Sequence, residues 1–322
     1  GDVMPPLLEL DKITKNYGQF KAIKELSFSV NEGEILGFLG LNGSGKTTTI
    51  KILAGLLPDY DGRIIYKGKT ERSIGNKPEI TFIFDSQNFY DNLTAYENLR
   101  IISYLNLSKF KKRSIKKDIT YALEQIGLKD WIYKPVKTFS RGMKQRLSLA
   151  SALLLHPDFL ILDEPTNGLD IDGIYLVEQY FSTLSKSGCT ILLSSHYLEE
   201  VERLANHIII IHKGEKKFDG SNESLAIMKL LGVTITFNEI LDNNKKETIE
   251  RLILETSIPI TKIDFYENKL EVNFNTQDYI DKVNDLSNYI EKINNLLFEN
   301  KFKISFIEPI YKHLKELFFI EK

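Results

Sequence analysis

A glycine-rich turn between an apolar run and an amphipathic segment constrains this chain more than any other feature. Residues 40–47 read Gly-Leu-Asn-Gly-Ser-Gly-Lys-Thr and match the spacing G-x-x-x-x-G-K-[ST]. The apolar run 35–39 precedes the turn, and apolar side chains recur at helical spacing over 50–57 after it. Strand, turn and helix in this order form the context in which the spacing binds phosphate. We therefore expect an α/β fold with a nucleotide at the end of one strand.

The turn also predicts which atoms meet the nucleotide. Glycines let the backbone curl so that successive N–H groups face phosphate oxygens, and the helix N-terminus adds partial positive charge. Lys46 is expected to reach the β- and γ-phosphates, and Thr47 to ligate Mg²⁺. The predicted ligands are thus ATP and Mg²⁺. The predicted nucleotide-binding residues are Gly40, Leu41, Asn42, Gly43, Ser44, Gly45, Lys46, Thr47 and Thr48.

A second apolar run ends in two acids. Residues 159–162 are apolar and lead directly into Asp163 and Glu164. A strand that ends this way places Asp163 near Mg²⁺ and lets Glu164 act as general base on the attacking water. The alternative is a strand end that simply enters the turn at Pro165.

The order of apolar segments predicts the architecture of residues 1–228. Further buried-strand candidates are 80–84, 190–193 and 208–211, with helical segments between most strands, which is typical of a mainly parallel sheet. The alternating pattern over 8–30 predicts a short antiparallel sheet before the turn. Residues 88–156 carry helical patterns and no strong strand, so we expect a helical subdomain inserted into the sheet.

The composition changes near residue 229. Residues 229–322 hold 13 basic and 16 acidic side chains and read as strand, helix, hairpin, helix, strand and a last short helix. This order predicts a small α+β accessory domain of the split βαββαβ kind.

Charge and cysteine content exclude several classes of protein. Forty-two basic against 44 acidic side chains give a net charge of −2, so the chain lacks the global positive field that holds nucleic acid. The single cysteine, Cys189, cannot form an internal disulfide or a cysteine cluster. No run approaches the ~20 apolar residues of a membrane span, and residues 1–6 have no basic or apolar stretch of a signal peptide. We expect a water-soluble chain of the cytosol.

Residues 139–146, Phe-Ser-Arg-Gly-Met-Lys-Gln-Arg, open a second helix with Ser140 placed as its N-cap. Here the sequence resembles the ATP-binding subunits of ABC transporters, whose signature is usually Leu-Ser-Gly-Gly-Gln. Arg141 and Met143 depart from that form. Export-type subunits, including those of bacitracin and lantibiotic transporters, tolerate such variation.

The resemblance implies roles for further residues. Tyr17 matches the aromatic that stacks on adenine, residues 167–170 match the D-loop that contains Asp170, and His196 matches the switch histidine beside the γ-phosphate. Family members pair head to tail, so Ser140 and Gly142 of one subunit would face the ATP of the other. The residues expected to be catalytic are Lys46, Glu164 and His196.

The Q-loop match leaves two candidates for an additional Mg²⁺ contact. Gln87 fits by residue type, whereas spacing from residues 92–94 favours Asp85, where bacitracin-type relatives often carry an acid.

The function that the resemblance implies is ATP hydrolysis that powers export through a separate integral-membrane permease. The second nucleotide-binding subunit is expected to be another copy of this chain, and the pair is expected at the inner face of the cell membrane. No nucleic-acid partner is expected. The alternative is a soluble ABC ATPase that acts on ribosomes or DNA.

Overall fold

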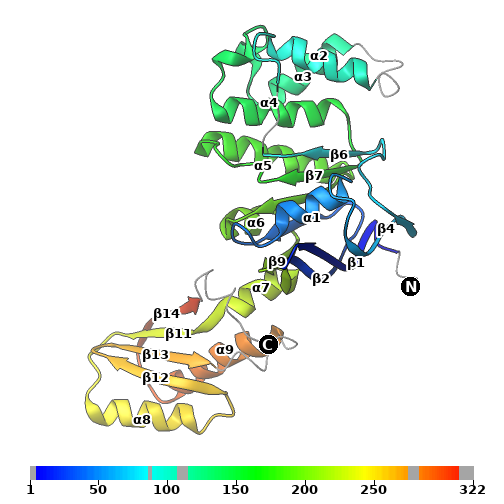
Figure 1. Ribbon diagram of the computed structural model, residues 1–322. Helices are drawn as coiled ribbons and strands as arrows, with labels where there is room; N and C mark the ends of the chain where they lie inside the picture. The colour runs from blue at the N-terminus through cyan, green and yellow to red at the C-terminus, as the bar shows by residue number, and fades with distance from the viewer. Residues whose placement is uncertain (1–4, 86–88, 107–114, 275–282, 312–322) are drawn as a thin grey trace. The chain divides into compact units, whose positions relative to one another are not determined.

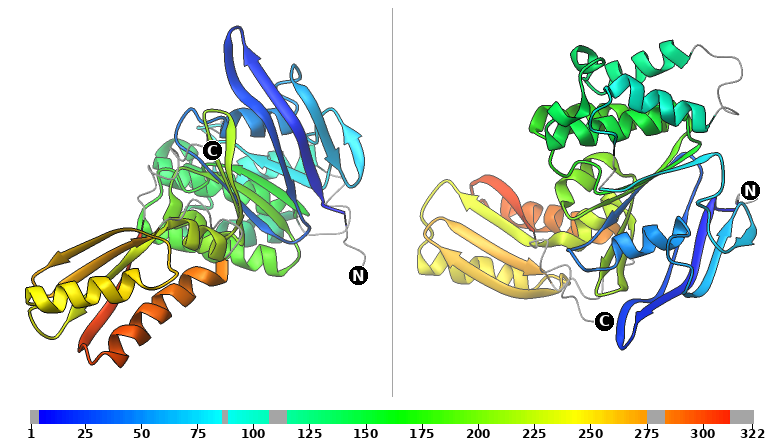
Figure 2. Two further views of the ribbon diagram at one scale, coloured as in Figure 1. Left: turned by 90° about the horizontal axis from the view of Figure 1, so that it is seen from below. Right: turned by 45° about the horizontal axis from the view of Figure 1, so that its top comes forward.

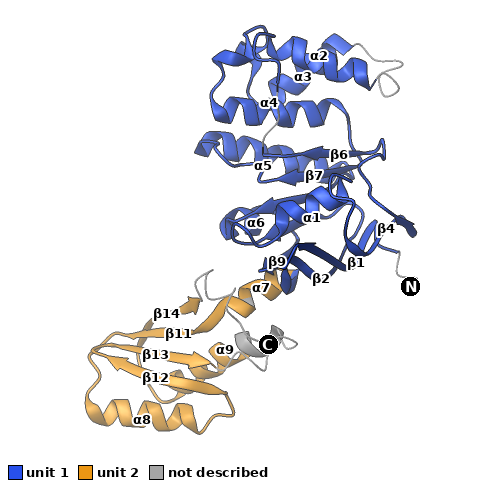
Figure 3. Cartoon of the chain, in the orientation of Figure 1, with its two compact units in different colours: residues 1–220 blue, residues 221–322 orange. Residues whose placement is uncertain are grey.

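The computed structural model describes residues 5–85, 89–106, 115–274 and 283–311. The chain divides into two compact units, residues 1–220 and 221–322 (Figures 1 and 3). Each unit has its own apolar core. The units are described separately below.

A parallel sheet forms the centre of the first unit. In the described part of residues 1–221, six strands lie in the order β10-β9-β3-β8-β7-β6, and the pairs β9/β3, β3/β8, β8/β7 and β7/β6 are parallel. Strands β3 and β7 are buried at every position because helices and the second sheet leave neither face to solvent, which explains their unbroken apolar runs. The strands are β3 (Ile35–Leu39), β6 (Ile80–Ile83), β7 (Phe159–Asp163), β8 (Thr190–Ser195), β9 (His207–His212) and β10 (Glu215–Ser221).

An antiparallel sheet, ordered β2-β1-β4-β5, packs onto the same core. Its strands are β1 (Leu8–Tyr17), β2 (Phe20–Val30), β4 (Asp61–Tyr66) and β5 (Lys69–Glu71). The β1/β2 hairpin closes at the pair Tyr17 and Phe20. Phe28 of this sheet and Phe38 of the parallel sheet meet with ring centroids 5.5 Å apart, so one core joins the two layers.

Helices α1 (Lys46–Leu53), α5 (Ile171–Lys186) and α6 (Leu198–Leu204) each follow a strand of the parallel sheet. Helix α1 begins directly after the glycine-rich turn, and α5 and α6 follow β7 and β8. Helix α6 contacts β3 and β8. None of the helices in the described part of the chain is long and apolar enough to cross a bilayer.

The predicted helical subdomain is a separate group beyond the β6 edge of the sheet (Figures 1 and 2). It contains α2 (Ala95–Leu105), α3 (Ile115–Gln125), α4 (Arg141–Leu154) and two short 3₁₀ turns, Lys129–Trp131 and Val136–Thr138. Thr94 and Glu97 form a capping box at the start of α2. At the start of α4, the Ser140 hydroxyl accepts a hydrogen bond from the Met143 N–H at 3.2 Å.

The second unit is an antiparallel sheet with helices. In its described residues the strand order is β12-β13-β11-β14, from β11 (Leu230–Phe237), β12 (Ile260–Tyr266), β13 (Lys269–Phe274) and β14 (Ile304–Tyr311). Helix α8 (Asn243–Leu254) follows β11, and α9 (Val283–Glu299) follows β13. The first strand lies between the third and the fourth, which is the split βαββαβ arrangement. The last predicted helix falls in 312–322, outside the described residues.

The predicted fold class, an α/β core with a parallel sheet and a small α+β unit, is confirmed. The boundary between the compact units lies after residue 220, one helix before the composition change at 229. Helix α7 (Asn222–Lys229) belongs to the second unit, because it contacts α9.

Candidate nucleotide site

The glycine-rich turn is shaped by two close approaches of the backbone. Gly45 has a φ of 112°, which side chains other than glycine rarely adopt. At Gly40 a Cβ atom would lie 2.4 Å from the Ser44 Oγ and 2.6 Å from the Ile211 carbonyl oxygen, so a larger residue does not fit. The turn therefore depends on glycine at both positions.

A pocket of about 450 Å³ opens in front of this turn. The residues that line it come from the β1/β2 hairpin, the turn, the ends of β6 and β7 and the position after β8. The lining residues are Tyr17, Phe20, Ala22, Asn42, Gly43, Ser44, Gly45, Lys46, Thr47, Thr48, Asp85, Asp163, Glu164, Asn167 and His196.

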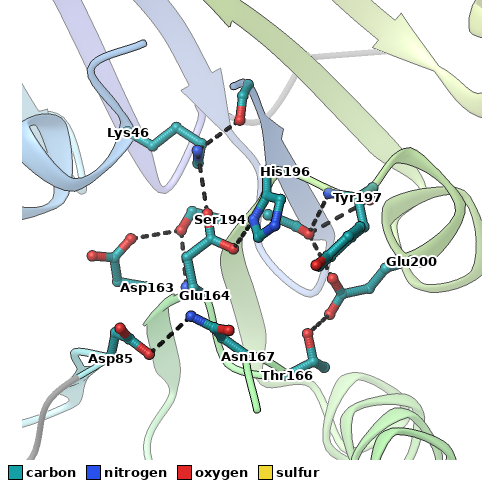
Figure 4. Close-up of polar contacts among 12 residues, drawn as sticks. Lys46, Asp85, Asp163, Glu164, Thr166, Asn167, Ser194, His196, Tyr197 and Glu200 are labelled. Atoms are coloured by element: carbon teal, nitrogen blue, oxygen red, sulfur yellow. Dashed lines mark hydrogen bonds and ion pairs between the residues drawn. The ribbon is translucent and has the colours of Figure 1, made fainter. Parts of the chain in front are cut away.

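The three residues predicted to be catalytic form one chain of contacts (Figure 4). The buried Lys46 Nζ donates to the Gly40 carbonyl at 2.7 Å and lies 3.2 Å from the Glu164 Oε1. The Glu164 Oε2 lies 2.8 Å from the His196 Nδ1. The carboxylate thus stands between the lysine that would hold phosphate and the imidazole that would face it.

Glu164 has a strained backbone. Its φ of 51° lies in the left-handed region, which non-glycine residues occupy at a cost of about 1–3 kcal/mol. Its N–H donates to the Ser194 Oγ at 3.0 Å, and that hydroxyl donates to the Asp163 Oδ1 at 2.7 Å. Ser194 therefore holds both acids of the strand end. Sequence reasoning did not assign it this role, although its place at the end of a strand that adjoins β7 is a usable signal.

Polar side chains in the turn and at the end of β7 suit a phosphate group and a metal ion. The Ser44 hydroxyl is buried and has no hydrogen-bond partner among the residues that the structure describes. A buried hydroxyl without a partner is costly, so a phosphate oxygen at this position would satisfy it. Thr47 is exposed within the pocket lining, and Asp163 lies in the same lining. Hydroxyl and carboxylate oxygens next to phosphate suit Mg²⁺.

Two aromatic residues of the β1/β2 hairpin line the pocket. Tyr17 and Phe20 are 48% and 64% exposed and face each other as a cross-strand pair. The Lys15 Nζ lies 5.2 Å from the centroid of the Tyr17 ring and is held by Asp59. Phe20 was not predicted as a site residue. The sequence feature that could have pointed to it is a pair of aromatic residues at the end of a hairpin.

Asp85 lines the pocket and also contacts two other side chains. Its Oδ1 lies 3.5 Å from a guanidinium nitrogen of Arg141 and accepts from the Asn167 side-chain amide at 3.4 Å. Arg141 stands where the family signature usually has glycine, so the structure brings an unusual signature residue to the acidic Q-loop candidate. Gln87 lies outside the described residues, and the choice between the two remains a prediction.

Five predicted nucleotide contacts do not line this pocket in the described part of the chain: Gly40 and Leu41 at the start of the turn, and Ser140, Gly142 and Asp170 in other elements. Ser140 and Asp170 serve as N-caps of α4 and α5. At Gly142 a Cβ atom would lie 2.9 Å from the Gly168 carbonyl oxygen. The N-terminus of α4 therefore packs closely on the D-loop, and within one subunit its polar groups do not reach the glycine-rich turn.

A buried acid contacts the segments that carry two of the residues predicted to be catalytic. Glu200, on α6, is 4% exposed. Its Oε2 accepts from the Ser195 hydroxyl at 2.5 Å, and its Oε1 accepts from the Thr166 hydroxyl. Burial raises the pKa of the Glu200 carboxyl, and the two hydroxyl hydrogen bonds oppose that shift. Sequence reasoning missed this residue.

Known proteins share this organisation. The family model described as ABC transporter matches residues 23–167. The bacitracin transport ATP-binding protein BcrA of Bacillus licheniformis is 44% identical over 306 residues, which cover 84% of this chain and 97% of that protein. The lantibiotic transport ATP-binding protein SrtF of Streptococcus pyogenes is 38% identical, over 67% of this chain and 93% of that protein.

Solved structures agree. The structure of an ATP-binding subunit of an ABC transporter matches with a TM-score of 0.60 and 29% identity, over 67% of this chain and 90% of that one. An ATP-binding cassette in its ADP conformation matches with a TM-score of 0.58 and 25% identity, over 67% and 91% of the two chains. The resemblance drawn from the signature and the turn is confirmed. The chain belongs to the ABC transporter family, as one of its ATP-binding proteins.

Proposed function

We propose that this chain hydrolyses ATP to power export of a substrate through a separate membrane permease. The observation that carries the proposal is the contact chain from Lys46 through Glu164 to His196 at the mouth of the phosphate-binding turn. It provides a cation for the γ-phosphate, a carboxylate for water and an imidazole that touches this carboxylate.

The residues around the turn fit Mg²⁺. Thr47 and Asp163 would hold the ion, with Asp85 or Gln87 as a further contact, directly or through water. The ion would neutralise charge on the phosphates. In the structure Lys46 pairs with Glu164, so phosphate binding would draw the lysine away and free the carboxylate to orient water.

A second copy of the chain would complete the site. Ser140 and Gly142 stand at the N-terminus of α4, where backbone N–H groups attract an anion, yet this terminus does not line the pocket of its own subunit. Head-to-tail pairing would place it over the γ-phosphate of the partner. Asp170 would lie at the same junction, because it is the last residue of the D-loop and caps α5.

The partner and cargo follow from the relatives. BcrA and SrtF are named for bacitracin and lantibiotic transport. We infer a permease partner, a position at the cytoplasmic face of the membrane, and a peptide antibiotic as the class of cargo to test first. The alternative, an ATPase that acts on ribosomes or DNA, is less favoured because these relatives are named for transport.

The test compares wild-type chain with Glu164→Gln. The amide keeps the shape of the side chain but cannot accept the proton of water, so Mg²⁺-ATP binding should persist while turnover falls at least about 100-fold. Steady-state phosphate release and equilibrium nucleotide binding measure the two effects. Unchanged turnover would refute the role of Glu164 as base.

The same variant identifies the partner. ATP-bound Glu164→Gln chain should retain a polytopic membrane protein when it is purified from detergent-solubilised native membranes. Recovery of ribosomal proteins without a permease would favour the alternative function.

A further inference from the structure

The loop that carries Glu164 and the turn that carries His196 come from different strands. Glu164 follows β7, and His196 follows β8. Their side chains meet at 2.8 Å, although the Glu164 backbone is in the left-handed region. The Ser194 hydroxyl accepts the Glu164 N–H and so ties the start of this loop to β8. A further contact is needed to hold the rest of the loop at a fixed spacing from the His196 turn, because a displacement of about 1 Å is enough to lower a reaction rate severely.

Glu200 makes such a contact with both segments. It accepts a hydrogen bond from Thr166, two residues after Glu164, and one from Ser195, the residue before His196 (Figure 4). The Ser195 Oγ in turn accepts the Tyr197 N–H at 3.0 Å, so the turn is held on both sides of the histidine.

The helix that carries Glu200 is firmly seated. Val201 lies against Gly37 of β3, where a Cβ atom would come within 2.2 Å of the Val201 Cγ1. Both Leu198 and Val201 are buried. A side chain that projects from such a packed element can hold mobile loops more precisely than a loop residue can.

We propose that Glu200 is a positioning residue for ATP hydrolysis, which holds Thr166 and Ser195 together and so fixes the distance between Glu164 and His196. This inference rests on the proposed function, since it assumes that Glu164 and His196 act on ATP. Glu200 does not line the pocket and would not touch the nucleotide. The competing interpretation is a buried acid that only stabilises the fold.

The kinetic test uses the full-length chain with Mg²⁺-ATP. Glu200→Ala should lower kcat by about 10- to 100-fold, whereas KM for ATP should change by less than about twofold, because the phosphate-binding turn is untouched. Glu200→Gln should recover most of the rate, since the amide oxygen accepts from one hydroxyl and the amide N–H donates to the other. Glu199→Ala is the matched control, because Glu199 is the exposed neighbour on the same helix and should leave kcat unchanged.

A spectroscopic readout separates positioning from stability. The imidazole nitrogen resonances of His196 in ¹⁵N-histidine-labelled protein should move in Glu200→Ala and return in Glu200→Gln. Those of His207, in β9, should stay in place in both. If Glu200→Ala fails to fold, Thr166→Val removes one of the two hydrogen bonds at nearly constant volume and should shift the same resonances.

Two outcomes overturn the inference. In the first, Glu200→Ala hydrolyses ATP like Glu199→Ala and leaves the His196 resonances unmoved. In the second, kcat falls together with nucleotide affinity and melting temperature, and Glu200→Gln does not recover it. The wild type and Glu164→Gln in the same assay keep the proposed function distinguishable: a wild-type chain that does not hydrolyse Mg²⁺-ATP rejects the proposed function, whereas an active wild type with an inactive Glu164→Gln and a normal Glu200→Ala rejects only the role of Glu200.

Discussion

At the residue scale, His207 lies between two carboxylates at the start of β9. Its Nδ1 is 3.2 Å from the Glu34 Oε1, and its Nε2 is 2.8 Å from the Asp219 Oδ1. Hydrogen bonds to Asp219 and Glu34 raise the pKa of the imidazole from 6.5 to about 9. The bond to Asp219 joins the neighbouring strands β9 and β10, and the bond to Glu34 joins positions 173 apart in sequence, so the charge of this residue matters for stability.

The raised pKa predicts a pH dependence of unfolding. Because protonation is stronger in the folded state, the stabilisation is complete below pH 6.5 and is lost as the pH rises through about 9. The free energy of unfolding should fall by about 2–3 kcal/mol across this window, with allowance for partial exposure. Urea titrations at pH 6 and pH 9.5 measure it. His207→Gln should flatten the dependence, and an equal fall in that variant would contradict the assignment.

Phe20 should contribute to binding of the nucleoside but not of the phosphates. It lines the pocket beside Tyr17, far from the turn in sequence. Phe20→Ala should weaken ATP binding about 2- to 10-fold, the range of one aromatic contact. Tripolyphosphate, which has no base, is the control ligand, and its affinity should not change. Equal losses for both ligands would show that the hairpin shapes the turn instead.

At the scale of elements, the first turn of α4 is linked to the end of β6. Arg141, the first residue of α4, pairs with Asp85, and Asn167 donates to the same carboxylate. The Gln145 side chain of α4 donates to the Pro165 carbonyl at 3.1 Å. The helical subdomain therefore contacts the loop after β7 directly, and a shift of α4 would displace Pro165, the residue after Glu164.

Asp85 is expected to act through the metal. Asp85→Ala should weaken binding of Mg²⁺-ATP roughly tenfold, as loss of a metal-linked carboxylate does, and should leave binding of metal-free ATP nearly unchanged. Gln87→Ala is the comparison. A loss in the second variant with none in the first would assign the Q-loop role to Gln87.

The elements were predictable where the physical cause is local. A strand buried on both faces must be apolar throughout, so 159–163 is visible in the sequence, and the glycine-rich turn is visible because only glycine fits at residues 40 and 45. The contact of Glu200 with Thr166 was not predictable, because it joins side chains 34 positions apart, with a helix and a strand between them. Phe20 and Ser194 each stand at the end of an expected strand, but only the sheet order shows which strand lies beside each of them.

At the scale of the whole molecule, two separate cores imply two separable responses to nucleotide. The site belongs wholly to the first unit, whereas the second unit has its own core around Ile235, Leu270 and Leu297. Trp131, the only tryptophan, lies in the first unit and reports on it alone.

Saturating Mg²⁺-ATP should therefore stabilise only the first unit. At 100 times Kd the gain is about 2.7 kcal/mol, so the melting transition of Trp131 fluorescence should move upward in Glu164→Gln chain, which does not consume the ligand. Hydrogen exchange at the buried amides of β11 and β13 should not change. Equal protection of both units would show that they unfold as one.

The backbone at Glu164 has a consequence for laboratory evolution. Glycine or asparagine occupies a φ of 51° more easily than glutamate does, so either would relieve strain at the cost of the carboxylate. A mutant library selected for heat resistance alone should then accumulate inactive sequences at this position. Selection of robust variants of this protein needs an activity screen at every round.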